Sequence, residues 1–304
     1  MSTAPLAAER RPAQAALLLL AMTSLFWGLN WPVMKLALTG IPVLPFRAIC
    51  LLVAGPTMLT IARLRGDSLR LSRGEALRLT LAAFFNVTLW HLSTAYGVSK
   101  MPAGRASIIA YTMPAWASLF GALFLGEKLT WSRVAALVLG MGGVAALLLP
   151  ELHAIRAAPL GAASMILAAL SWAAGTVVTK RYHWTGSVAA LTGWQICLGG
   201  APIVAAALII GPFPGLARAD AETLAALGYV IFCGMVIGQW GWFAVLARLP
   251  VARASIGTLA IPIIGVLSST LLLGERLGPP ELVALALVVA ALSLALRPGA
   301  PARS

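Results

Sequence analysis

The sequence predicts an all-α polytopic membrane protein, with ten transmembrane helices arranged as two inverted five-helix repeats around a central cavity. Three observations predict this fold. The 304-residue chain is 60% hydrophobic and only 10% charged, whereas a soluble domain carries about 25% charged residues. Its apolar stretches have roughly the 20 residues that a helix needs to cross a bilayer. A long segment of the first half is also repeated in the second half.

Charged residues, prolines and glycines divide the chain into apolar stretches. We expect transmembrane helices at 14–38, 43–62, 76–97, 102–124, 132–149, 158–180, 188–210, 223–247, 251–273 and 281–296. The longest predicted connection runs from Arg63 to Glu75, so no soluble catalytic or nucleic-acid-binding domain fits outside the membrane. The three cysteines fall inside predicted helices, where a small apolar role is the default. We expect no metal site and no cofactor.

The net charge of +13 is scattered through short connections. With the N-terminus inside, most lysines and arginines lie on the inner side, as the positive-inside rule requires. We therefore expect both termini in the cytoplasm. Arg10 and Arg11 precede an apolar run that continues through Trp27 and Pro32 without a small-residue cleavage site. The first helix is therefore not expected to be a cleaved signal peptide.

Residues 101–129 reappear as residues 249–277, with 12 of 29 pairs identical at a constant spacing of 148 positions. Trp27 and Lys35 likewise match Trp172 and Lys180 at a spacing of 145. We therefore divide the chain into repeats at 1–150 and 151–304. Because each repeat has five helices, the second must enter the membrane from the opposite side. Inverted repeats of this kind place substrate sites where the two halves meet.

Polar residues inside apolar helices are costly and point to function. All nine acidic residues map to connections or helix ends, which argues against a proton-driven carrier of lipophilic cations. His91 is the only histidine expected inside the bilayer. It would bind a carboxylate when charged or accept a hydrogen bond from an ammonium group when neutral. The alternative is a structural hydrogen bond between helices.

Helical spacing gathers other polar and aromatic residues on shared faces of the first, fourth, sixth, eighth and ninth helices. The candidate substrate-binding residues are Trp27, Asn30, His91, Tyr111, Trp172, Thr176, Gln239, Trp242 and Thr258, and the candidate gating or kink residues are Pro32, Pro114 and Pro262. A tryptophan at a helix end could instead be an interfacial anchor, and an interior proline could be a static kink.

Two further pairs of residues recur in both repeats. Arg105 and Arg253 begin the fourth and ninth helices, and we expect them to extend to lipid headgroups. Gly126 and Gly274 should end the same helices, and the glutamate after each should bond to neighbouring backbone. The fifth and tenth helices carry few polar groups. We expect them to be peripheral, where small residues could support a weak dimer.

The opening Leu-Phe-Trp-Gly-Leu-Asn at 25–30, together with Gly-Glu-Lys-Leu at 126–129 and Gly-Glu-Arg-Leu at 274–277, resembles the EamA family of the drug/metabolite transporter superfamily. Within it, the chain is most similar to bacterial aromatic and neutral amino-acid exporters of the YddG type. The resemblance implies ten helices, inverted repeats, a central cavity, a bacterial inner-membrane location and export by alternating access.

The expected function is export of aromatic and neutral amino acids, or of related small metabolites. The alternative is a carrier of anionic metabolites, of the nucleotide-sugar kind, which would need intramembrane clusters of lysine or arginine. Lys35 and Arg47 are the candidates, but they lie near helix ends. No hydrolase, zinc-protease or phosphate-binding motif is present, so we do not expect an enzyme. The expected partners are an amino-acid substrate and the lipid bilayer, with no nucleic acid, in a monomer or weak homodimer.

Overall fold

The computed structural model describes residues 4–126, 131–148, 158–210, 216–246 and 260–295. These residues form helices and short connections, with no strand among them. In chain order the elements are α1 (Ala4–Gly40), α2 (Val43–Leu64), α3 (Arg73–Ala83), the π-helix η1 (Phe84–Leu89), α4 (Trp90–Lys100), α5 (Ala103–Ala110), α6 (Met113–Leu125), α7 (Trp131–Leu148), α8 (Ala158–Arg181), α9 (Val188–Ile210), the 3₁₀-helix η3 (Leu216–Arg218), α10 (Ala221–Tyr229), the π-helix η4 (Val230–Ile237), α11 (Gly238–Leu246), α13 (Ala260–Leu273) and α14 (Pro279–Ala295).

The helices have the length and composition of a multi-pass membrane protein. Five helical segments of the described chain are long and apolar enough to span a bilayer: Val43–Leu64, Ala103–Leu125, Pro159–Arg181, Val188–Ile209 and Ala221–Gly241. Shorter apolar helices cover Val134–Leu147, Ala260–Leu273 and Pro279–Leu294. The all-helical prediction is therefore confirmed for the described part of the chain.

Three of the predicted helices are interrupted. The predicted helix 76–97 is divided into α3, η1 and α4, and its counterpart 223–247 contains η4 between α10 and α11. The predicted helix 102–124 breaks at Tyr111 and Thr112, and Pro114 follows as the second residue of α6, where a missing N–H costs no helical bond. By contrast, α1 continues through Pro32. Short π-helical turns often occur at functional sites, so we look for a site beside η1 and η4.

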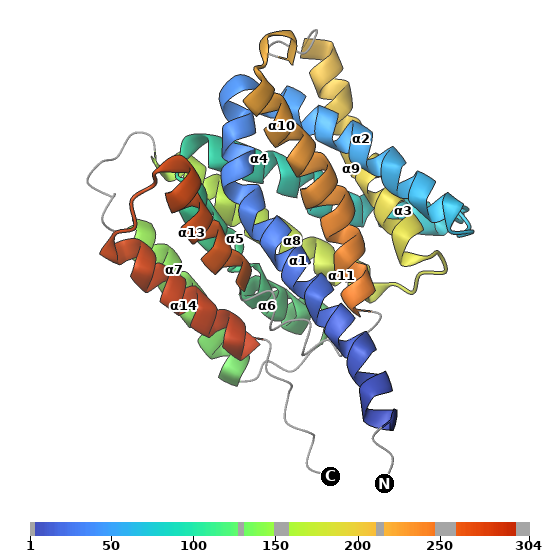
Figure 1. Cartoon of the computed structure of the whole chain (residues 1–304), viewed down its shortest axis with the longest axis horizontal. Helices are drawn as coiled ribbons and strands as arrows, with labels where there is room; N and C mark the ends of the chain where they lie inside the picture. Colours follow the sequence, from blue (N-terminus) through green and yellow to red (C-terminus); the bar gives the residue numbers. More distant parts are fainter. Residues whose placement is uncertain (1–3, 127–130, 149–157, 211–215, 247–259, 296–304) are drawn as a thin grey trace.

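The two halves of the chain are interleaved. Helix α1 packs against α10, α11 and α13 of the second half, and α8 packs against α4 and α6 of the first. Helices α2 and α9 pack together on one side of the bundle, and α7 and α14 on the other (Figure 1). The expected peripheral position of α7 and α14 is confirmed. Their contact is close, because a Cβ on Gly143 would lie 3.0 Å from a Val288 methyl carbon.

Glycines end two helices in the left-handed conformation. Gly126 follows α6 with a φ of 68°, and Gly274 follows α13 with a φ of 65°. A residue with a side chain is strained at such angles, whereas glycine adopts them freely. Both predicted helix stops are therefore confirmed.

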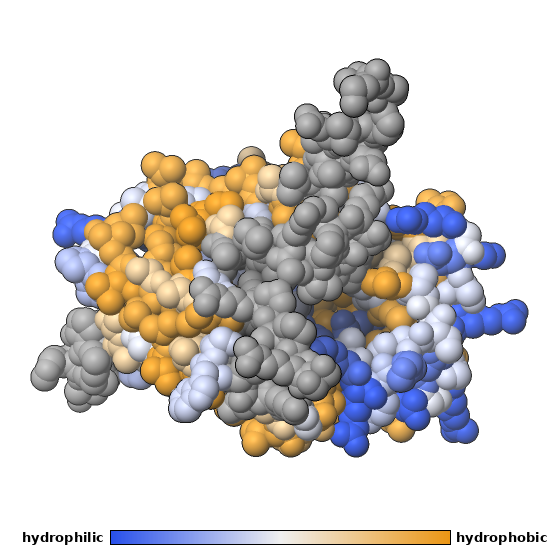
Figure 2. Space-filling view, turned by 90° about the horizontal axis from the view of Figure 1, so that it is seen from below, coloured by the Kyte–Doolittle hydropathy of each residue, from blue (hydrophilic) through white to orange (hydrophobic). Residues whose placement is uncertain are grey.

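Hydrophilic residues gather at one end of the bundle. The connection between α2 and α3, with the helix ends beside it, carries the exposed residues Arg63, Arg65, Arg70 and Arg73. Figure 2 shows hydrophilic surface on the side where this connection lies and apolar surface over much of the rest. Helix α1 begins and α14 ends towards the bottom of the view in Figure 1.

Glu75 joins the start of α3 to the connection that follows α8. Its carboxylate accepts hydrogen bonds from the Thr185 N–H at 2.9 Å, the Thr185 hydroxyl at 2.8 Å and the Ser72 N–H at 3.2 Å. The Ser72 hydroxyl caps the same helix by accepting from the Glu75 N–H. The bonds from Thr185 and Ser72 lower the pKa of Glu75 to about 2.

This lowered pKa makes the stability of the helix junction depend on pH. Because the folded-state pKa lies below the unfolded value of about 4.3, the stabilisation is complete above that value and is lost as the pH falls towards 2. We expect Glu75→Gln to lower the melting temperature at pH 7 and to flatten its fall in acid. Thermal melts of detergent-purified protein from pH 7 to pH 3 test this, with the exposed Glu222→Gln as control. Parallel curves for wild type and Glu75→Gln would contradict the assignment.

Candidate functional site

Side chains of α1 lie over glycines of the interrupted helix that contains η4. A Cβ on Gly234 would lie 2.5 Å from the amide oxygen of Asn30, and a Cβ on Gly238 would lie 2.5 Å from the indole nitrogen of Trp27. That indole donates a hydrogen bond of 3.0 Å to the carbonyl of Gly234. The two candidate residues of α1 therefore fit into space that only glycine leaves open.

A matching contact joins α8 to the other interrupted helix. The amide of Asn86, in η1, occupies the place where a Cβ on Gly175 would lie. One helical turn away, the rings of Trp90 and Trp172 are 4.9 Å apart between centroids, at an angle of 55°. Such an aromatic pair contributes about 0.5–1.5 kcal/mol beyond the area it buries. Trp172 thus lies inside the bundle beside the residue that precedes His91.

These two contacts exchange their residue types between the halves. At the spacings of the sequence repeat, Asn30 corresponds to Gly175 and Asn86 corresponds to Gly234. Each contact therefore pairs one asparagine with one glycine. The asparagine lies on α1 in one contact and on η1 in the other.

Four buried side-chain atoms have no hydrogen-bond partner in the described part of the chain. They are Thr23 Oγ1, Asn30 Oδ1, Asn86 Oδ1 and His91 Nδ1. An unsatisfied buried polar group costs about 1–3 kcal/mol, so native proteins keep few of them without a reason. All four lie in the predicted helices 14–38 and 76–97, which carry the candidate residues Asn30 and His91, and hydrogen bonds to a ligand would offset their cost.

Arg47 is a buried cation near the start of α2, as the sequence predicted. It lies in α2 with 3% of its surface exposed. Its Nε donates to the His91 carbonyl at 2.9 Å, and Nη2 donates to Thr94 Oγ1 at 3.0 Å and to Met34 Sδ at 2.7 Å. A basic residue inside an apolar run was the available signal. Its role here is to join α1, α2 and α4 through uncharged acceptors.

The other candidates occupy varied positions. Tyr111, at the break between α5 and α6, contacts Trp31 edge-on at 6.5 Å between ring centroids. Thr176 donates to the Trp172 carbonyl at 2.8 Å and lines a cavity of about 120 Å³ between α6 and α8. Gln239 is half-buried in α11. Pro262 is the third residue of α13. The Trp242 side chain and Thr258 lie outside the described residues.

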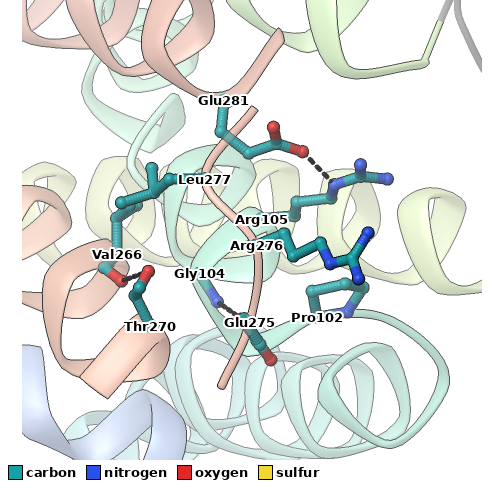
Figure 3. Close-up of a pocket in the computed structure, with 9 residues that line it drawn as sticks. All are labelled: Pro102, Gly104, Arg105, Val266, Thr270, Glu275, Arg276, Leu277 and Glu281. Atoms are coloured by element: carbon teal, nitrogen blue, oxygen red, sulfur yellow. Dashed lines mark hydrogen bonds and ion pairs between the residues drawn. The ribbon is translucent and has the colours of Figure 1, made fainter. Parts of the chain in front are cut away.

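The expectation for Arg105 was wrong. Its Nε is 2.6 Å from Glu281 Oε1, so this side chain forms an ion pair with the first turn of α14 (Figure 3). The partner is 176 positions away in sequence, which hides it from any local pattern. Arg253 lies outside the described residues. Within the described ranges, no group of three or more His, Cys, Asp or Glu side chains could hold a metal ion.

The model of the EamA-like transporter family matches this sequence twice, at residues 14–149 and 159–297. The chain belongs to the EamA-like transporter family. Membership makes it a transporter rather than an enzyme, built from a duplicated domain. The expected resemblance is thereby confirmed.

Similar curated proteins are transporters from several bacteria. "Probable amino-acid metabolite efflux pump" of Escherichia coli is 30% identical over 83% of this chain and 84% of its own length. "Uncharacterized transporter YvbV" of Bacillus subtilis is 28% identical over 94% and 93%. "Probable terminal-alkyne amino-acid exporter" of Streptantibioticus cattleyicolor is 26% identical over 90% and 91%. One crystal structure aligns with 93% of this chain and 96% of its own, with a TM-score of 0.66 and 19% identity, which shows a shared fold.

The asparagine–glycine contacts lead to a stability test. Gly175→Ala should lower the melting temperature by several degrees, because its methyl group would overlap the Asn86 amide and overpacking costs about 1–3 kcal/mol. Adding Asn86→Ala should recover most of the loss. The control is Gly228→Ala, where a Cβ would meet nothing within 4 Å. Equal losses in the single and double variants would show that the two residues are not coupled.

Proposed function

We propose that this protein is an alternating-access exporter of aromatic and neutral amino acids, or of closely related small metabolites, in a bacterial inner membrane. Its ten helices would form two inverted five-helix repeats, with both termini in the cytoplasm. Two observations support the inverted arrangement: the exchanged Asn30–Gly234 and Asn86–Gly175 contacts, and the interleaved packing of α1 and α8 against opposite halves.

The observation that carries the proposal is the set of unpartnered amide and imidazole atoms among tryptophan rings. The oxygens of Asn30 and Asn86 accept hydrogen bonds, and an amino acid's ammonium group donates up to three. The imidazole of His91 serves either end of a zwitterion, according to its protonation. The adjacent Trp90 and Trp172 rings offer flat apolar faces to an aromatic or aliphatic side chain.

The relatives support the same substrate class. Two of the similar proteins are named for amino acids, one as a probable amino-acid metabolite efflux pump and one as a probable terminal-alkyne amino-acid exporter. Both align with more than four-fifths of this chain. These likenesses favour export of amino acids or their derivatives.

The alternative of an anionic-metabolite carrier needs cations that are available to the substrate. Lys35 instead donates to the carbonyls of Val98 and Met101, at 2.7 and 2.8 Å. The Arg47 guanidinium donates its hydrogen bonds to the three neutral acceptors described above. Both candidate cations are engaged by protein groups, which favours a zwitterion over an anion. Competition by phosphorylated anions, with none by amino acids, would reverse this preference.

His91→Ala tests the assigned site. Counterflow of labelled threonine, methionine and aromatic amino acids in proteoliposomes should fall about tenfold or more, because each lost hydrogen bond to a charged group contributes about 1.5–3 kcal/mol. Folding should persist, since Arg47 bonds the His91 backbone carbonyl and not its side chain. The matched control is His183→Ala, at an exposed position in the α8–α9 connection. Equal counterflow in both variants would remove His91 from the site.

The same vesicles test the coupling of transport to protons. If uptake follows an imposed pH gradient in the wild type, His91→Ala should abolish that response while the amino acid still equilibrates slowly. Uptake that ignores the gradient in both proteins would identify a facilitator and leave His91 with binding alone. No uptake of any amino acid would refute the proposed substrate class.

A further inference from the structure

Two ionic side chains hold the corner between α4 and α5. Helix α4 ends at Lys100 and α5 begins at Ala103. The ammonium of Lys35 donates to two carbonyls at the end of α4, as described above. The carboxylate of Glu275 accepts from the N–H groups of Ala103, at 2.6 Å, and Gly104, at 3.0 Å. A cation thus binds the negative end of one helix, and an anion binds the positive end of the next.

These side chains come from distant parts of the chain. Lys35 belongs to α1, and Glu275 belongs to the connection between α13 and α14. The left-handed turn at Gly274 redirects the chain after α13, directly before Glu275. The corner is therefore tied at once to the first helix of one half and to the last two helices of the other.

A second tie lies beside the first. Arg105, in the first turn of α5, pairs with Glu281, which also accepts from the Gly278 N–H at 2.8 Å. Figure 3 shows both carboxylates reaching α5 from the α13–α14 side, around a cavity of about 180 Å³. Two carboxylates from one half therefore fasten the start of a single helix of the other half.

The contact between α1 and α13 beneath this corner is tightly closed. A Cβ on Gly28 would lie 2.5 Å from Ile264 side-chain atoms. Ser269 of α13 has no exposed surface, and Trp31 of α1 is 5% exposed. At these described positions the two helices are in direct contact.

The corresponding contact in the other half, between α6 and α8, is looser. Repeat spacing matches α8 to α1 and α6 to α13, with Lys180 at the position of Lys35 and Gly121 at that of Ser269. Here the cavity of about 120 Å³ lies between the helices, lined by Lys180, Gly121 and Thr176 among others. Equivalent positions are thus fully packed in one half and line a cavity in the other.

We propose that Lys35 and Glu275 together form the latch of a gate at the α4–α5 corner, and that this structure is the state with that gate closed. The inference rests on the transport function proposed above. Under the proposed topology the corner faces the outside, so the closed latch belongs to the state that loads substrate from the cytoplasm. Opening requires both side chains to leave the helix ends they bind.

Thiol accessibility tests the latch without reference to any substrate. In a background with Cys50, Cys197 and Cys233 replaced by alanine, Ser269→Cys places a reporter behind the corner. A membrane-impermeant thiol reagent added outside whole cells should react slowly with it. Glu275→Gln and Lys35→Met should each raise the rate about tenfold or more, because each removes charge-assisted hydrogen bonds.

Matched controls lie at the same end of the bundle. Glu222→Gln changes an exposed carboxylate at the start of α10. Lys100→Met changes a lysine next to the corner whose ammonium lies 5.7 Å from the centre of the Tyr96 ring. Neither should change the labelling rate. Unchanged rates in the Glu275 and Lys35 variants, or equal increases in the controls, would overturn the proposal.

A disulfide provides a second test that does not weaken the fold. A Cβ on Gly104 would lie 3.6 Å from the Ser269 Cβ, within the range that a disulfide requires. Gly104→Cys with Ser269→Cys should cross-link under mild oxidation, and adding Glu275→Gln should slow that reaction. The cross-link should stop counterflow, and a reductant should restore it. Full counterflow in the cross-linked protein would show that this contact need not open.

The two tests separate the latch from the substrate proposal. If the Glu275 and Lys35 variants expose the reporter but no amino acid is transported, the latch stands and the substrate class fails. If amino acids are transported while exposure never changes, the transport function stands and the latch fails.

Discussion

The structure depends on one constraint: in a bilayer, the protein itself must satisfy every backbone polar group. Each interruption of a helix releases such groups, and side chains from other helices bind several of them. Trp27 bonds the Gly234 carbonyl in η4, Arg47 bonds the His91 carbonyl just after η1, and Lys35 bonds the end of α4. The positions that allow irregular backbone in the bundle centre are therefore also the positions that tie distant helices together.

Local signals in the sequence predicted much of the fold. Apolar length gave the helices, and glycine chemistry gave the stops at Gly126 and Gly274. Pro114 was expected to kink a continuous helix, whereas the helix breaks at Tyr111 and Thr112 and Pro114 lies in the first turn of α6. The π-helices were not predicted, because a shift to i→i+5 bonding has no distinctive residue type. The Arg105–Glu281 pair was missed because it joins residues far apart in sequence.

The candidate site was predicted in its composition but not in its geometry. The faces containing Trp27, Asn30 and Trp172 were visible from helical spacing. The glycines opposite them could not be recognised from the sequence, because their role is to leave space for a side chain of a neighbouring helix. Sequence reasoning finds the residues that project, whereas the residues that make room become apparent only when the packing is known. The repeat then shows that the asparagine and the glycine of each contact have changed places between the two halves.

The interleaving of the halves also constrains how the protein is made. Trp27 bonds a carbonyl 207 positions further along the chain, and most partners of α1 belong to the second half. During synthesis, α1 therefore enters the membrane long before the helices that it packs against. Its polar side chains, Asn30 among them, must remain at the insertion machinery or against temporary neighbours until α10, α11 and α13 are made. A nascent chain that ends after α7 contains the whole first repeat but still lacks the second-repeat helices that α1 packs against.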